Sequence, residues 1–242
     1  MSAAGGLRAY PRRGLIWQNA PVSRPRVVLH GSVSVDGRLA GFPVDRDLHE
    51  EIGARIGADA VLAGSGTMLA VAAAHGVDLS GEDAGRLPPA VDGRPLLVVA
   101  DGRGRLTRLR WLRDLPRWRD VVVWCCADTP PEHTDRLRRL GAGHVVTRGA
   151  RVDLAAGLGS LAVGYAVSTV RADAGGMLAA RLAEDGLVDE LSLIVAPHVA
   201  GAASSRAGDT ARLLDQVSAR RLMLADVQPL RDGHVWLRYA LP

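Results

Sequence analysis

The sequence predicts an α/β fold in which a mixed, mostly parallel sheet lies between two layers of helices. From residue 26 onward, short apolar strands alternate with amphipathic helical segments. This alternation is typical of parallel strands that are covered on both faces. From residue 221 the pattern changes to two strands around a tight turn. That change predicts an antiparallel hairpin at the end of the sheet.

The first elements have clear local signals. Residues 27 to 35 are rich in valine and end at an Asp-Gly turn, which predicts the first strand. Asp45 is a suitable N-cap for a helix that reaches about Gly57, because apolar residues recur on one helical face. The other predicted strands are 58–63, 96–100, 121–125, 145–147, 166–171, 190–196, 221–230 and 234–240, and the other predicted helices are 68–74, 130–140, 153–161 and 177–185.

One large domain accounts for most of the chain. The 242 residues are 48% hydrophobic, which is enough for a full core. Residues 1–25 are rich in Gly, Pro and Arg and show no periodicity, so we expect an extended N-terminal arm. Residues 26–242 then form the domain.

Composition excludes several classes of chemistry. All thirty cationic side chains are Arg, so neither a Schiff-base lysine nor a Walker phosphate-binding loop is available. Cys125 and Cys126 are adjacent and cannot form a C-x-x-C pair, which favours a reducing cytoplasm. The zinc deaminase signature is absent, and no histidine pair has metal-ligand spacing, so we expect no metal site. Without a long apolar run, we also expect no membrane segment.

Seven arginines lie between Arg103 and Arg119. They either bind a phosphate group, which the planar guanidinium fork suits, or form a solvated face. Nucleic-acid binding would need stacking aromatics among the basic residues, and aromatic residues are only 4% of the chain. We therefore expect no nucleic-acid partner.

Two glycine-containing junctions are candidates for an anion site. The pair Gly175-Gly176 precedes a predicted helix, and Gly64-Ser65-Gly66-Thr67 follows a predicted strand and opens another. Glycine lets the backbone approach a ligand, and a helix N-terminus offers free N–H groups. Two such junctions at one sheet edge suit the pyrophosphate of a dinucleotide. The alternative is that these glycines only punctuate loops.

Four motifs in matching order resemble one family, the riboflavin-biosynthesis pyrimidine reductases, which include the C-terminal reductase domain of the bifunctional deaminase-reductase and stand-alone relatives. The motifs are SVDGRLA at residues 34–40, ADAVLAGSGT at 58–67, RPLLVV at 94–99, and GLVDEL at 186–191 with Ala196-Pro197. The resemblance implies a dihydrofolate-reductase-like fold, NADPH as coenzyme and a homodimer. It also implies hydride transfer to a ribosylaminopyrimidine phosphate, whose ribose carbon is reduced.

The resemblance also assigns roles by position. Asp173, where the family has Glu, is the expected proton donor, with the N-cap of the next helix as its alternative role. Asp36 is a second catalytic candidate that would flank the nicotinamide. His30 and Ser34 are candidate substrate contacts, and a buried core histidine is the alternative for His30. The expected cofactor-binding residues are Gly37, Gly64, Ser65, Gly66, Thr67, Gly175, Gly176, Met177 and Leu178, with Arg103 or Arg105 at the 2′-phosphate.

One departure from the family leaves the substrate open. Where the family continues into an Asp-Asp-Pro stretch that grips the substrate, residues 68–75 read MLAVAAAH and contain no carboxylate. The first alternative is a reductase of a dihydropterin or of a specialised metabolite. The second is a catalytically inert homologue that only binds a nucleotide.

Overall fold

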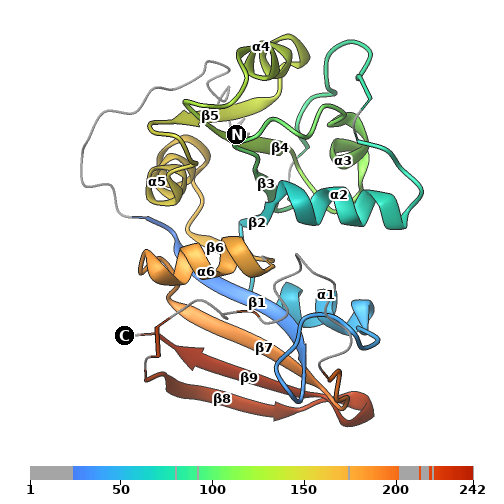
Figure 1. The fold of residues 1–242 in the computed structure, drawn as a ribbon, viewed down its shortest axis with the longest axis vertical. Coiled ribbons are helices and arrows are strands. Elements are labelled where there is room, and N and C mark those ends of the chain that lie inside the picture. The colour runs from blue at the N-terminus through green and yellow to red at the C-terminus, as the bar shows by residue number, and fades with distance from the viewer. Residues whose placement is uncertain are drawn as a thin grey trace, which may run out of the picture.

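The computed structural model describes residues 24–79, 81–91, 93–173, 175–201, 213, 218–219 and 221–241. The predicted arm lies outside these residues, except for its last two positions. Within the described residues nine strands form one sheet in the order β5-β4-β3-β2-β6-β1-β7-β9-β8 (Figure 1). The strands are β1 (Arg26–Ser34), β2 (Ala60–Gly64), β3 (Leu96–Ala100), β4 (Val121–Cys126), β5 (Gly143–Thr147), β6 (Thr169–Ala172), β7 (Glu190–Ala196), β8 (Met223–Pro229) and β9 (Val235–Ala240).

The sheet is parallel from β5 to β7 and antiparallel at its C-terminal edge. β6 pairs with both β1 and β2, and β7 pairs with the other side of β1. β9 then runs antiparallel to β7, and β8 antiparallel to β9. The predicted mixed sheet with a C-terminal hairpin is confirmed.

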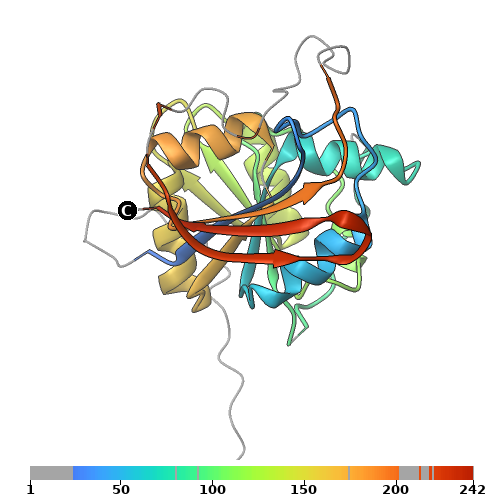
Figure 2. The same ribbon diagram turned by 90° about the horizontal axis from the view of Figure 1, so that it is seen from below.

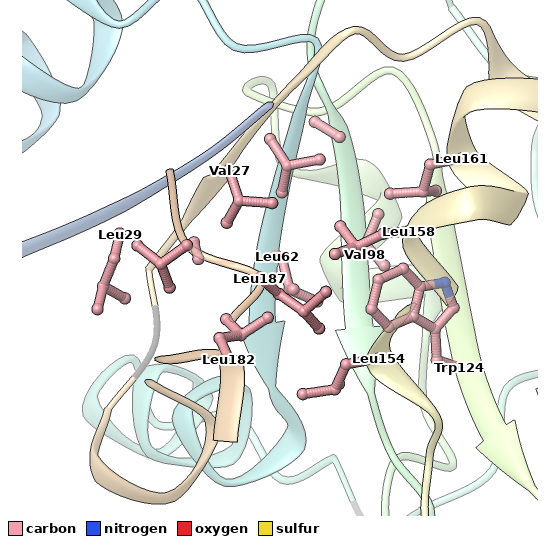
Figure 3. Packing of buried hydrophobic residues seen from close by; sticks show 14 of the residues in the cluster. Val27, Leu29, Leu62, Val98, Trp124, Leu154, Leu158, Leu161, Leu182 and Leu187 are labelled. Carbon is pink, nitrogen blue, oxygen red and sulfur yellow. The ribbon is translucent and has the colours of Figure 1, made fainter. Parts of the chain in front are cut away.

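Helices cover both faces of this sheet (Figure 2). They are α1 (Arg46–Arg55), α2 (Ser65–Ala74), α3 (Arg110–Asp114), α4 (Pro131–Leu140), α5 (Leu154–Tyr165) and α6 (Gly176–Glu184). On one face, α5 and α6 pack on alternate strand residues, including Leu62, Val98 and Trp124 (Figure 3). The intervening strand residues, such as Val61, Val99 and Val123, point to the other face, where α2, α3 and α4 pack on them. The fold is therefore the expected three-layer α/β/α arrangement.

α1 lies on the same face as α2. Its buried residues Leu48 and Ile52 contact Ile194 and Trp236, while the neighbouring Leu193 packs into the core under α5 and α6. Successive strand residues point to opposite faces, so α1 covers the β1 and β7 part of the α2 face. Asp45 caps α1 as predicted, accepting a 2.8 Å bond from the amide of Leu48.

Several predicted boundaries were wrong. The stretch 64–67 is not a loop, because Gly64 both ends β2 and serves as the N-cap of α2, which begins at Ser65. α5 continues to Tyr165 and closes at Ala166 in the left-handed region, so β6 begins at Thr169 rather than at 166. The short helix α3 was not predicted.

The arginine-rich stretch is mostly bonded within the protein. Arg108 and Arg110 donate to backbone carbonyls of the 76–93 connection. Arg113 is buried and lies 3.2 Å from Asp120, and Arg117 pairs with Glu50 at 2.7 Å. The bonds of Arg108 and Arg110 attach a long polar connection to the domain, and Arg113 and Arg117 pair with carboxylates, so these four arginines are engaged within the protein. No helix in the described part of the chain is long and apolar enough to cross a membrane.

Candidate active site

The carboxyl end of β6 is recessed between its two neighbours. Ala172, the last residue of β6, pairs with Leu29 in β1 and with Leu62 in β2. β1 continues beyond this level to Ser34, and β2 continues to Gly64. The sheet therefore has a notch at its carboxyl edge where β6 stops.

The chain leaves this notch toward opposite faces. β2 leads into α2 on one face of the sheet, whereas β6 leads into α6 on the other face (Figure 1). Adjacent parallel strands whose connections diverge in this way leave a ligand-binding crevice between the two connections in open α/β sheets. The topology thus singles out the carboxyl ends of β2 and β6.

The structure brings the two glycine junctions together at this place. Gly64 and Gly175 are the N-caps of α2 and α6, and neither helix has a side-chain cap. α1 and α5, in contrast, are capped by Asp45 and Asp153. A methyl group on Gly64 would lie 3.9 Å from Cδ2 of Leu178, so α2 and α6 begin close to each other. Two helix N-termini without carboxylate caps form an environment that favours an anion.

Arg105 adds a positive charge to the start of α2. Its Nη2 donates to Oγ of Ser65 at 2.8 Å and lies 3.5 Å from a methyl group placed on Gly66. Ser65 is buried, whereas Arg105 is exposed. Arg103 is also exposed on the same loop. Of the two predicted arginines, the structure places Arg105 at the junction itself.

The other residues that are predicted to bind the coenzyme differ in their exposure to solvent. Gly175 is exposed, and a methyl group on it would meet no atom within 4 Å. Met177, in the first turn of α6, is 73% exposed, while Leu178 is partly buried against the core. Thr67 is half-buried in the first turn of α2. The backbone at both junctions is therefore accessible from outside.

Asp173 lies at the bottom of the notch. Its amide donates to the carbonyl of Leu62 at 2.9 Å, and its Oδ2 accepts a 2.7 Å bond from Nη2 of Arg171. Its Oδ1 is buried and has no partner among the described residues. The alternative role as a helix N-cap is wrong, because Gly175 occupies that position. The structure thus presents a carboxylate with one oxygen uncommitted.

His30 is a buried histidine with a hydrogen-bond partner at each ring nitrogen. Trp236 can only donate, and its Nε1 bonds Oγ of Ser192 at 2.8 Å. That hydroxyl then donates to Nδ1 of His30 at 3.0 Å, and Nε2 of His30 donates to the carbonyl of His49 at 3.2 Å. Burial lowers the pKa of His30 to about 3. With 1% exposure, its position fits the alternative of a core histidine and not a substrate contact.

Ser34 and Asp36 form a turn at the end of β1. The Ser34 hydroxyl donates to Oδ1 of Asp36 at 2.7 Å and accepts from the amide of Arg38. The amides of Ala200 and Gly201 also donate to the Asp36 carboxylate. These bonds lower the pKa of Asp36 well below its ordinary value, and the bond from Ser34 has the largest effect. Asp36 is therefore an anion that ties the turn to residues 200–201, and it has no proton to give near neutral pH.

The turn also uses Gly37 for its conformation. Gly37 has φ +77°, in the left-handed region that glycine adopts without a steric penalty. The turn it closes lies beyond the level at which β6 ends, because β1 extends past Ala172. The structure therefore places Gly37 at the carboxyl edge of the sheet, on the same edge as the notch.

The apolar stretch after Thr67 has a structural explanation. Met68 and Ala72 are buried against β2 and β3 in the core under α2. The stretch forms most of α2 and its C-cap, and it carries no carboxylate where the family has its acidic motif. Among the described residues, no cluster of three or more His, Cys, Asp or Glu is arranged to hold a metal ion.

Arg171 and Glu50 were not predicted as site residues. Arg171 is buried within β6 and pairs with both Asp173 and Glu50. A signal was present in the sequence, because Arg171 is a lone charge inside an apolar strand pattern. Its partner on α1 could not be identified without knowing which helix covers β6.

The model of one protein family, described as the RibD C-terminal domain, matches residues 25–235. A curated relative, the 2,5-diamino-6-ribosylamino-4(3H)-pyrimidinone 5′-phosphate reductase of Methanothermobacter thermautotrophicus, is 28% identical over 190 residues, which are 76% of this chain and 82% of the relative.

Two solved structures share the fold. A pyrimidine reductase-like protein of Corynebacterium diphtheriae has a TM-score of 0.65 at 18% identity, covering 90% of this chain and 92% of that one. RibD of Acinetobacter baumannii has a TM-score of 0.60 at 20% identity, covering 90% of this chain and 58% of that one. Since the family model spans most of its length, the chain belongs to the RibD C-terminal domain family and is an oxidoreductase.

Proposed function

We propose that the chain transfers a hydride from NADPH to the ribosyl carbon of a ribosylaminopyrimidine phosphate. The observation that carries the proposal is the meeting of two uncapped helix N-termini at the recessed end of β6. The name of the archaeal relative supports the substrate class. Family membership supports the reaction type.

The residues present fit a dinucleotide. The first-turn amides of α2 and α6 would hold the pyrophosphate, because both are free of side-chain caps. Arg105 would meet a 2′-phosphate, since it already lies over Ser65 at the same helix start. The open space at Gly175 lets a ligand approach the backbone closely. The bound coenzyme supplies the hydride, and the protein supplies orientation.

The ribosylamine accepts a hydride in its ring-opened imine form, in which the ring carbon–oxygen bond has broken and the ribosyl carbon is doubly bonded to nitrogen. Reduction then adds the hydride at carbon and a proton at nitrogen. Asp173 is the carboxyl group at the notch with an oxygen that bonds no described residue. We assign it the role of holding or relaying that proton. Asp36 does not serve this role, since both of its carboxylate oxygens already accept hydrogen bonds from Ser34, Arg38 and the amides of residues 200–201.

The core packing of residues 68–75 favours a second candidate. Because this segment offers no carboxylate to a substrate, a related heterocycle such as a dihydropterin fits the same hydride geometry.

A homodimer in the cytoplasm is also part of the proposal. Three exposed apolar side chains on the edge strand β8, Met223, Leu224 and Val227, support self-association. Light scattering of the purified chain measures its mass.

The function is tested by mixing the purified chain with NADPH and each candidate substrate. Loss of the absorbance of reduced nicotinamide with the pyrimidine phosphate, and not with a dihydropterin, is the expected result. Coenzyme binding is followed separately through tryptophan fluorescence, with NADH as the matched control. Binding without oxidation across the panel would identify an inert homologue, and absence of binding would remove the proposal.

A further inference from the structure

Arg171 is a buried cation in a central strand. It is 5% exposed, and its neighbours Val170 and Ala172 point into the core under α5 and α6. Strand residues alternate between faces, so the Arg171 side chain extends toward α1. A buried charge is costly unless it is paired and hydrogen-bonded. Its contacts therefore show what it does.

The surface of α1 is shaped to receive this side chain. Gly53 lies directly against the guanidinium, and a methyl group at that position would overlap Nη1. Glu50, one turn earlier on α1, accepts from Nη2 of Arg171 at 3.3 Å. On the other side, the same Nη2 donates to Oδ2 of Asp173 at 2.7 Å. The guanidinium thus joins α1 to the carboxylate at the notch.

The charges around Arg171 keep it ionised. Burial lowers its pKa, but attraction to Asp173 and Glu50 outweighs burial, so the pKa is raised. The other titratable groups that face it are His30 and His49, and burial lowers the pKa of both. Both histidines are thus neutral near pH 7. Arg171 is the buried cation of the cluster, while the exposed Arg117 pairs with the other carboxylate oxygen of Glu50.

We propose that Arg171 is a positioning residue for Asp173, held by Glu50 and by the space that Gly53 leaves on α1. This inference rests on the proposed function of the site. Arg171 engages Oδ2 of Asp173, which fixes the carboxylate and leaves Oδ1 for the reacting group. A loosely held carboxylate would fill the same space without a defined direction.

Arg171→Met tests the role, and Gly53→Ala displaces the guanidinium without removing it. Both variants are expected to lower kcat about 100-fold, the loss that follows from a misplaced catalytic group. NADPH affinity and KM should change little, because neither residue contacts the helix starts. Arg171→Lys should restore part of the rate, since it keeps the charge but not the fork.

Two matched controls separate positioning from stability. Arg113 is equally buried and is paired with Asp120, which precedes β4, a strand separated from β6 by β2 and β3. Gly164 is a helical glycine with open space around it. Arg113→Met and Gly164→Ala should leave kcat unchanged. If Arg171→Met keeps the wild-type kcat, or if Arg113→Met lowers it equally, the positioning role is wrong.

Failure of the proposed function gives a different result. If the wild-type chain oxidises NADPH with none of the candidate substrates, the proposed reaction is wrong. Urea unfolding then tests the contact between Arg171 and Asp173 by itself. Arg171→Met, Asp173→Asn and the double variant are compared at neutral pH. Coupled residues give a double variant that unfolds at the same urea concentration as the weaker single variant. Additive shifts would refute the arrangement.

Discussion

Two glycines of α5 should respond in opposite directions to the same substitution. Gly157 faces the indole of Trp124. This tryptophan is fully buried and lies beside Leu154 and Leu158 of α5 (Figure 3). A methyl group on Gly157 would lie 2.9 Å from Cδ2, Cε2 and Cε3 of that ring. Gly164, near the end of the same helix, has no atom within 4 Å of the same position.

The expected magnitudes follow from these contacts. Alanine is better than glycine in a helix by up to about 1 kcal/mol. Gly164→Ala receives this gain undiminished, because nothing obstructs the new methyl. Gly157→Ala must also move a fully buried indole, and overpacking of a core costs about 1–3 kcal/mol. The free energy of unfolding should therefore rise for Gly164→Ala and fall by up to about 2 kcal/mol for Gly157→Ala, since about 1 kcal/mol of the cost is offset.

Urea unfolding followed by far-ultraviolet circular dichroism measures both variants without relying on the fluorescence of the displaced tryptophan. Equal m-values would show that the midpoints report stability alone. The prediction concerns the difference between the two variants, which cancels the shared helix propensity. Equal stabilisation by both substitutions would refute the packing of α5 on Trp124.

Three further changes have defined outcomes. Asp45→Ala removes the N-cap of α1 and should lower the free energy of unfolding by about 1 kcal/mol, whereas an unchanged urea midpoint would mean that the cap is replaced by water. Arg105→Met should weaken NADPH binding about 10- to 100-fold, the loss of one charge-assisted bond, and leave NADH binding nearly unchanged in a fluorescence titration; equal losses for both coenzymes would place the 2′-phosphate elsewhere. His30, with a folded pKa of about 3, takes up a proton mainly when unfolded, so its contribution is complete above the unfolded pKa of about 6.5 and declines as the pH falls below it. The melting temperature of His30→Gln should then fall less than that of the wild type between about pH 7 and pH 5, and parallel curves would contradict the buried neutral state.

Much of the local structure could be predicted from short stretches. β7 has the predicted bounds because its short run of apolar residues is a local signal. α1 starts after Asp45 because capping is also local. The two glycine junctions could be named for the same reason. Prediction is wrong where the signal for a strand end and the signal for a helix start fall on the same residue. Gly64 is an example, because it lies outside both predicted elements and yet ends β2 and caps α2.

The roles of individual polar residues depended on distant neighbours. From sequence alone, His30 could be a substrate contact or a core residue, and only its burial and its contacts with Ser192 and His49 favour the core. The bonds from the amides of residues 200–201 to Asp36 are a second case, since they tie its turn to a segment more than 160 residues away. Hydrogen bonds of this kind join segments that lie far apart in the sequence, so no local pattern encodes them.

The sequence by itself determined the alternation of strands and helices, the C-terminal hairpin and the two glycine junctions, since periodicity and turn chemistry act over a few residues. The tertiary structure decided that β6 inserts between β1 and β2, which creates the notch and places α2 and α6 together. It also decided the pairing of Glu50 with Arg171, which are 121 residues apart in the chain. Strand order depends on the burial of whole faces, and that free energy belongs to the assembled layers and not to any single segment.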